Sequence, residues 1–216
     1  MESDDGSLFM SVELVKNYTK FHRIMEMTRD GEIIESKYID VKGNCTGFFP
    51  FFRHPKQKAT NVFVYFVHGN PTTFNAIWFD NNLNIRREIC TTLPYSNNNR
   101  DIIFSGAASC ILDSENNIVI MKRVDETNNF ICLKLDLAGN IIMEKEITID
   151  ANFYRQQLYN ALTVYNEKPL QYAFSFVNNI GYSLNRIGTA VLDSEFNIID
   201  ENHCIVPDLY SEQRTN

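Results

Sequence analysis

The sequence lacks several features that would assign it to a class at once. No run of apolar residues is long enough to cross a membrane. There is no surplus of basic residues, because 20 Lys and Arg stand against 27 Asp and Glu, for a net charge of −7. Without such a surplus, little charge is available to displace counterions from nucleic acid. We therefore expect no nucleic-acid partner and no membrane insertion.

The sequence also lacks a Cys-x-x-Cys pair, and its five cysteines are an odd number. Cys110 and Cys132 lie in strand-like runs, where a free cysteine behaves as a small buried apolar residue. This pattern favours buried free thiols over a disulfide framework, although the second interpretation remains open. Buried free thiols would suit a reducing compartment if the chain is complete.

No motif typical of catalysis or of phosphate binding is present, neither Gly-x-Ser-x-Gly, Gly-x-x-x-x-Gly-Lys nor Gly-x-Gly-x-x-Gly. The run Asp80-x-Asn82-x-Asn84 begins like a calcium loop, but Ile85 and Thr91 stand where that loop needs glycine and glutamate. The four histidines lack metal-ligand spacing: His22, His54, His68 and His203. We expect no catalytic residue, no metal and no cofactor, and we favour a non-enzymatic protein while leaving an enzyme open.

What the sequence does contain is a repeat. Asp80, Asp136 and Asp193 are each followed four residues later by asparagine and then by isoleucine, and they lie 56 and 57 residues apart. A weaker copy surrounds Thr28, with Asp30-Gly31 after it. A fixed period of this length predicts stacked supersecondary units.

Each block between aspartate and asparagine suits a hairpin turn, because Asp, Asn and Gly tolerate left-handed backbone angles and their side chains satisfy turn amides. A second block of the same kind, Asp113 to Asn117, lies 23 residues before Asp136. Two hairpins per repeat give four strands, which is the content of a propeller blade. The sequence therefore predicts an all-β fold, a β-propeller or propeller segment of four four-stranded antiparallel blades.

We expect residues 1–216 to form a single propeller-like domain. Its repeats cover about 4–40, 45–90, 105–148 and 158–204. The first repeat lacks its inner strand, and residues 205–214, with Pro207 and several charges, would supply that strand poorly. We favour a fragment, or a subunit completed by a partner, over a closed ring, and an open arrangement would promote self-association.

Residues 116–147 and 4–39 carry a family resemblance. They resemble bacterial β-propeller repeat proteins whose blades have DGG and LDxxGNII motifs. The resemblance implies the fold and leaves the function open. The aromatic residue that often follows this motif is replaced by Met143, Arg86 and Asp200. The N-terminal MESDD lacks an export signal, whereas the family it resembles is often exported, so localisation stays open.

In a propeller, the longer connections between blades and within them gather on one face, and rigid scaffolds commonly carry function in loops. Tyrosine and arginine are enriched at binding hot spots. The candidate binding residues are Tyr95, Arg100, Phe153, Tyr154, Arg155 and His68. In the alternative interpretation, the two aromatic residues at 153 and 154 cap the apolar gap between blades. For the single tryptophan, Trp78, core packing is favoured over ligand stacking.

The function that these observations favour is an interaction scaffold that binds a protein, peptide or glycan through its longer-loop face. Two alternatives remain open. One is a propeller hydrolase or lyase with a site at the axis, and the other is a purely structural segment of a larger propeller. The predicted inner strands, residues 105–112 and 160–165, lack the titratable cluster that an axial site needs.

Overall fold

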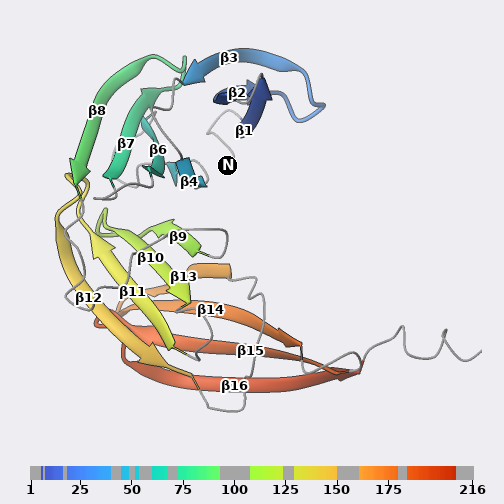
Figure 1. Cartoon of the computed structure of the whole chain (residues 1–216), viewed down its shortest axis with the longest axis vertical. Coiled ribbons are helices and arrows are strands. Elements are labelled where there is room, and N and C mark those ends of the chain that lie inside the picture. Colours follow the sequence, from blue (N-terminus) through green and yellow to red (C-terminus); the bar gives the residue numbers. More distant parts are fainter. Residues whose placement is uncertain are drawn as a thin grey trace, which may run out of the picture. The chain divides into compact units, whose positions relative to one another are not determined.

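The fold is taken from a computed structural model of the chain. It describes residues 6, 8–16, 19–39, 45–48, 52–53, 60–67, 73–92, 108–123, 129–149, 161–179 and 184–207. All regular structure in these ranges is β-strand (Figure 1). Within them, no helix has the length and apolar character needed to cross a membrane.

The strands form four antiparallel sheets, which we call blades 1 to 4 (Figure 1). Blade 1 contains β1 (Leu8–Lys16), β2 (Thr19–Met27) and β3 (Ile33–Ile39). Blade 2 contains β4 (Cys45–Phe48), β5 (Phe52–Arg53), β6 (Thr60–Val67), β7 (Thr73–Asp80) and β8 (Ile85–Thr92). Blade 3 contains β9 (Ala108–Leu112), β10 (Ile118–Arg123), β11 (Asn129–Leu135) and β12 (Ile141–Thr148). Blade 4 contains β13 (Ala161–Glu167), β14 (Leu170–Asn179), β15 (Leu184–Asp193) and β16 (Ile198–Pro207).

The predicted all-β class with four antiparallel sheets is confirmed. Within the described ranges, blade 1 has three strands, β1 to β3. The first strand of blade 2 ends at Phe48, before Pro50, and β5 then pairs separately with β6. Proline lacks the N–H that a continuous ladder would need there, which explains the break.

The chain divides into two compact parts. The N-terminal part comprises residues 1–106 with the hairpin 136–140, and the C-terminal part comprises residues 107–135 and 141–216. Each part has its own apolar core, and the single domain expected over residues 1–216 stays a prediction.

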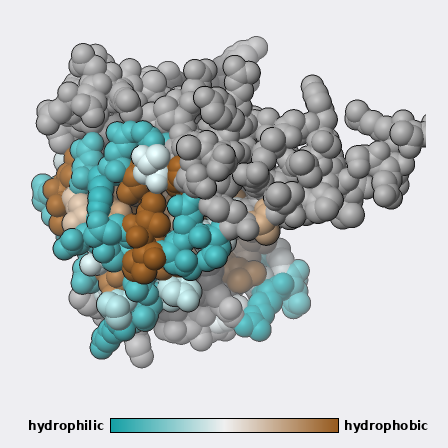
Figure 2. Space-filling view, turned by 90° about the horizontal axis from the view of Figure 1, so that it is seen from below, coloured by the Kyte–Doolittle hydropathy of each residue, from teal (hydrophilic) through white to brown (hydrophobic). Residues whose placement is uncertain are grey.

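The two cores are built from the faces of successive strands. The N-terminal core consists of Phe9, Ile24, Ile39, Phe63, Tyr65, Ile77, Phe79 and Leu83. The C-terminal core consists of Val119, Met121, Phe130, Cys132, Ile147, Ile149, Leu162, Leu170, Tyr172, Phe174, Phe176, Ala190, Leu192 and Phe196. The middle strand β7 is buried along nearly its whole length, whereas the outer strand β12 alternates between more and less exposed residues. This contrast is expected because a middle strand is covered on both faces and an outer strand is not. On the side seen in Figure 2, a narrow hydrophobic band lies between hydrophilic side chains.

The repeated turns share one geometry. Asp80, Asp136 and Asp193 each begin the hairpin between the last two strands of a blade, as predicted. In each, the carboxylate oxygen Oδ1 accepts N–H bonds from the residues two and four positions later, at 2.8–3.0 Å. The asparagine four residues later donates from Nδ2 to the other oxygen, Oδ2. These carboxylates therefore act as turn acceptors, which supports the hairpin interpretation over the calcium loop.

The residue three positions after each aspartate adopts a left-handed backbone: Leu83 (φ 55°), Gly139 (φ 84°) and Phe196 (φ 59°). Leu83 and Phe196 lie in the two cores although bulky residues rarely adopt positive φ. At Gly139 a Cβ would lie 2.8 Å from Cδ1 of Phe74, so the site has no room for a side chain. This turn position therefore holds a side chain of the apolar core at Leu83 and Phe196, and a glycine at Gly139.

The predictions for cysteine and tryptophan have a mixed outcome. Cys110 and Cys132 are free and buried, as predicted. Cys90 and Cys204 are also free but exposed, so the expectation of burial was wrong for these two outer-strand residues. Trp78 is 5% exposed and packs in its sheet with the guanidinium of an arginine over its ring, which favours the core interpretation.

Candidate functional site

The six binding residues predicted from sequence, namely Tyr95, Arg100, Phe153, Tyr154, Arg155 and His68, lie outside the described residues. Their role stays a prediction. Among the histidines, His22 is buried, with its ring centroid 6.0 Å from that of Phe63. It therefore belongs to the interior of the N-terminal part.

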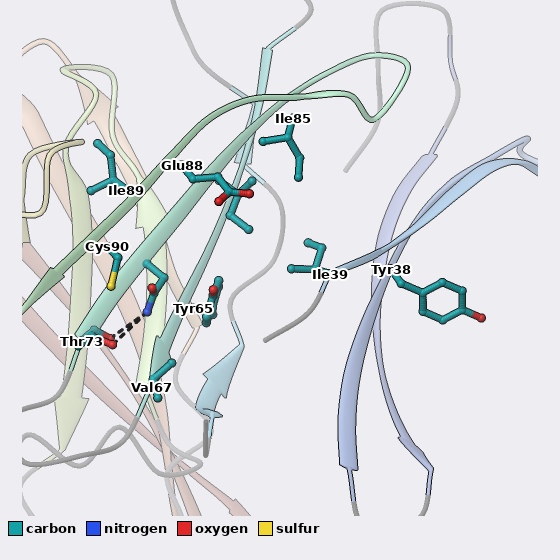
Figure 3. Close-up of a pocket in the computed structure, with 11 residues that line it drawn as sticks. Tyr38, Ile39, Tyr65, Val67, Thr73, Ile85, Glu88, Ile89 and Cys90 are labelled. Atoms are coloured by element: carbon teal, nitrogen blue, oxygen red, sulfur yellow. Dashed lines mark hydrogen bonds between the residues drawn. The ribbon is translucent and has the colours of Figure 1, made fainter. Parts of the chain in front are cut away.

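The N-terminal part contains a cavity of about 680 Å³ between blades 1 and 2. This volume lies in the range of small-molecule pockets. Its lining residues come from four strands: Tyr38, Ile39, Tyr65, Val67, Thr73, Asn75, Ile77, Ile85, Glu88, Ile89 and Cys90. Figure 3 shows these side chains, with Tyr38 directed away from the others.

Sheet register explains how the cavity wall in blade 2 forms. Residues directly opposite one another in antiparallel strands point to the same face. Tyr65 lies opposite Asn75, and Asn75 lies opposite Cys90 on the other side. Ile77 lies opposite Glu88 in the same way. One face of β6, β7 and β8 therefore presents these five side chains together.

The cavity wall combines an apolar surface with a few polar groups. Asn75 is 7% exposed and donates from Nδ2 to the Thr73 hydroxyl at 3.2 Å and to the Thr73 carbonyl at 3.4 Å. Both bonds use the amide nitrogen, which leaves the carbonyl oxygen Oδ1 as the acceptor that Asn75 can offer a ligand. Among the described lining residues, Glu88 is the only one with a formal charge at neutral pH.

Part of the lining lies at strand ends that precede the longer loops. Val67 ends β6, Thr73 begins β7, and Cys90 lies two residues before the end of β8. His68, one of the residues predicted from sequence, follows Val67 directly in the chain. The cavity therefore reaches the end of blade 2 from which the sequence predicts binding loops to extend.

A second polar cluster lies inside the C-terminal part. Asp113 is 1% exposed and accepts a bond of 2.9 Å from the hydroxyl of Tyr172, which is fully buried. Lys134 donates from Nζ to the Ser194 carbonyl at 2.9 Å and lies over the rings of Tyr172 and Phe196. Burial, followed by the charge of Asp113, raises the pKa of Tyr172 above its usual value.

This second cluster fits a structural role. Besides Tyr172, Asp113 accepts N–H bonds from Glu115 at 2.9 Å and from Asn117 at 2.8 Å. Both carboxylate oxygens of Asp113 are thus hydrogen-bonded, and its bond to Tyr172 links blade 3 to blade 4. Within the described residues, no group of three or more His, Cys, Asp or Glu is placed to hold a metal ion.

Comparisons with known proteins add little. A scan against protein-family models gives no match, and a search of curated proteins gives none. Among solved structures, the chain is similar to a GH43 β-1,3-galactosidase determined with galactodeoxynojirimycin. The match has a TM-score of 0.45 and 10% sequence identity, and it covers 94% of this chain and 78% of that one. Similarity at this level assigns neither a substrate nor a reaction to this chain.

The cavity could not be predicted from the sequence, because its lining residues are spread over several strands whose residue patterns are typical of an apolar core. One signal was available in β7, where Thr73 and Asn75 place polar groups on one face of an otherwise apolar strand. A polar residue buried in a middle strand needs a partner or a ligand. Only the pairing of β6, β7 and β8 shows that Asn75 lies on a cavity wall.

Proposed function

We propose that this protein is a non-enzymatic interaction scaffold that binds a protein, peptide or glycan at the longer-loop end of its N-terminal part. The observation that carries the proposal is the cavity of about 680 Å³ between blades 1 and 2. Its wall combines apolar side chains with polar groups that can fix the orientation of a ligand, as the walls of binding pockets do.

The lining chemistry supports binding rather than catalysis. The described lining residues include one carboxylate, Glu88, and one thiol, Cys90, and these lie two residues apart on β8. Nucleophilic catalysis needs a base that activates the nucleophile, commonly a histidine, and the described lining residues include no histidine. Glycoside hydrolysis in most families uses a pair of carboxylates, whereas these lining residues include a single carboxylate.

The proposal is tested by filling the cavity. The protein is screened on peptide and glycan arrays, and its best ligand is then titrated against two variants. Cys90→Trp places an indole in the cavity, whereas Cys204→Trp makes the same change at another exposed outer-strand cysteine, in blade 4.

We expect Cys90→Trp to abolish binding while Cys204→Trp retains it, with both variants keeping the wild-type circular dichroism spectrum. Equal binding by all three proteins would place the ligand elsewhere and contradict the proposal. Failure of every array ligand to bind wild-type protein would also count against it.

A further inference from the structure

The chemistry of the cavity also indicates which ligand group it takes. We propose that it receives the cationic side chain of an arginine or lysine from a partner polypeptide. This inference rests on the proposed function and adds a specificity to the same site. It follows from the polar groups, the apolar walls and the charge of the lining.

Two of the polar groups on the wall, those of Glu88 and Asn75, offer acceptor oxygens to a ligand. An ionised Glu88 carboxylate only accepts, and Asn75 offers Oδ1 because both of its described bonds use Nδ2. On the paired strands β7 and β8, Glu88 lies opposite Ile77, and Asn75 is its diagonal neighbour. Such neighbours lie about 7–8 Å apart, so one group with several donors can reach both.

The apolar part of the wall suits the stem of a long cationic side chain. Four isoleucines line the cavity: Ile39, Ile77, Ile85 and Ile89. Ile85 is 39% exposed, so apolar surface stays open to a ligand at the start of β8. Arginine and lysine bury their methylene stems on such surface while their charged ends reach polar groups.

The charge of the cavity wall favours a cationic side chain over an anionic or neutral ligand. Among the described lining residues, Glu88 has the only formal charge, so the wall attracts a cation and disfavours a carboxylate or phosphate. The ring of Tyr65 faces the same side of the sheet and can stabilise a cation further. A neutral glycan could donate hydrogen bonds to Glu88 but would lack the attraction between opposite charges.

The test compares a cationic probe with its neutral isostere. N-acetylarginine methylamide, the same derivative of lysine, and the same derivative of citrulline are each titrated into isotope-labelled protein. Binding is followed through the chemical shift of the Asn75 side-chain amide. We expect the two cations to bind and citrulline, which has the shape of arginine without its charge, to bind at least about fivefold more weakly.

Two protein variants provide the matched control. Glu88→Gln removes the charge from the cavity, and Glu144→Gln makes the same change 56 residues later, at the corresponding outer-strand position of blade 3. Both residues are exposed, so neither change should prevent folding. Glu88→Gln should weaken arginine binding about fivefold and remove its dependence on salt, while Glu144→Gln leaves both unchanged.

Equal affinity for arginine and citrulline, together with an unchanged Glu88→Gln variant, would overturn the inference. If an array ligand without a cation binds and is lost in Cys90→Trp, this inference fails while the scaffold proposal stands. Agmatine has the guanidinium without peptide groups. Tighter binding of agmatine than of the peptide-like probe would point to a small amine and contradict a polypeptide partner.

Discussion

Gly139 and Gly31 share a left-handed backbone but differ in their surroundings. Gly139 has φ 84° and a Cβ there would lie 2.8 Å from Phe74 and 3.0 Å from Thr91, whereas Gly31 has φ 90° and nothing within 4 Å. The pair therefore separates the cost of the backbone conformation from the cost of crowding.

We expect Gly31→Ala to lower the free energy of unfolding by about 1 kcal/mol, the cost of the left-handed backbone alone. Gly139→Ala should lower it by about 2–3 kcal/mol, because the methyl group must also displace neighbouring atoms. Chemical denaturation of both variants measures the difference. Equal losses would show that the hairpin 136–140 is not packed as described.

Cys90, Cys110, Cys132 and Cys204 form a second residue-scale contrast. Burial raises the pKa of the Cys132 thiol to about 12, against a smaller lowering by Lys145, and burial raises that of Cys110 well above its usual value. Because these folded-state pKa values are raised, their stabilising contribution is complete below about pH 8.5. It is lost as the pH rises toward 12.

In native protein at pH 8, we expect a thiol reagent to modify Cys90 and Cys204 within minutes and to leave Cys110 and Cys132 intact until unfolding. Peptide mass mapping after timed quenching measures each site, and a denatured sample provides the control for intrinsic reactivity. Fast native modification of Cys132 would contradict its placement in the C-terminal core.

At this scale, the sequence predicted turn residues better than it predicted exposure. The positive φ at Gly139 follows from its place in an Asp-to-Asn turn, and the burial of Cys110 and Cys132 follows from their strand-like neighbours. The exposure of Cys90 and Cys204 could not be predicted from their neighbours in the sequence. It depends on which strand is outermost in each sheet, which local sequence does not state.

At the scale of elements, the hairpin beginning at Asp193 shows what fixes a turn. Its carboxylate accepts N–H bonds from Glu195 and Asn197 at 2.9 and 2.8 Å. Lys145, on β12, donates to the Asn197 side chain and, at 3.3 Å, to the Glu195 carbonyl. Blade 3 therefore holds the turn of blade 4 by side-chain contacts within the C-terminal part.

Burial alone would raise the pKa of Asp193, but the bonds from Asn197 and Glu195 and the charge of Lys145 hold it below its usual value. A lowered folded-state pKa means that the stabilising contribution is present above about pH 4 and is lost as the pH falls below it. The same direction holds for Asp80 and Asp136, so acid should weaken all three turns.

At pH 7, we expect Asp193→Ala to lower the free energy of unfolding by about 1–2 kcal/mol, because two turn amides lose their acceptor. Asp193→Asn keeps an oxygen acceptor, so it should lose less stability, and because an amide does not titrate it should remove this residue's share of the stability loss below about pH 4. Denaturation from pH 3 to pH 7 measures both effects.

Asp200→Ala is the control, since Asp200 is exposed on β16 and its described bond goes to the side chain of Asn202. This change should stay within about 0.5 kcal/mol of wild type. An Asp193→Ala variant as stable as Asp200→Ala would show that the turn does not depend on its carboxylate.

Strand positions were largely predictable because each repeat is marked by its turns. The outer strand Ile33–Ile39 ends inside the first predicted repeat, 4–40, and β4 ends before Pro50, which lacks the N–H that a ladder needs. The last strand extends to Pro207, beyond the expected end at Cys204. Its pairing with β15 continues through Leu184 and Pro207, a long-range contact that local pattern does not contain.

For the whole molecule, the sequence predicted the blades but not the site. Four repeats gave four sheets, because turn chemistry and apolar alternation act locally. The cavity joins residues of β3, β6, β7 and β8, which meet only through sheet register and blade packing. The six loop residues favoured from sequence lie outside the described residues, so their part in binding stays a prediction.

Methyl NMR tests across the whole chain whether the cavity of the N-terminal part binds the ligand. Protein labelled at isoleucine methyl groups is titrated with the best array ligand. We expect shift changes at Ile39, Ile77 and Ile85, which line the cavity, and none at Ile118 and Ile120 in blade 3. Changes confined to blade 3 or blade 4, with the cavity methyl groups unmoved, would contradict it.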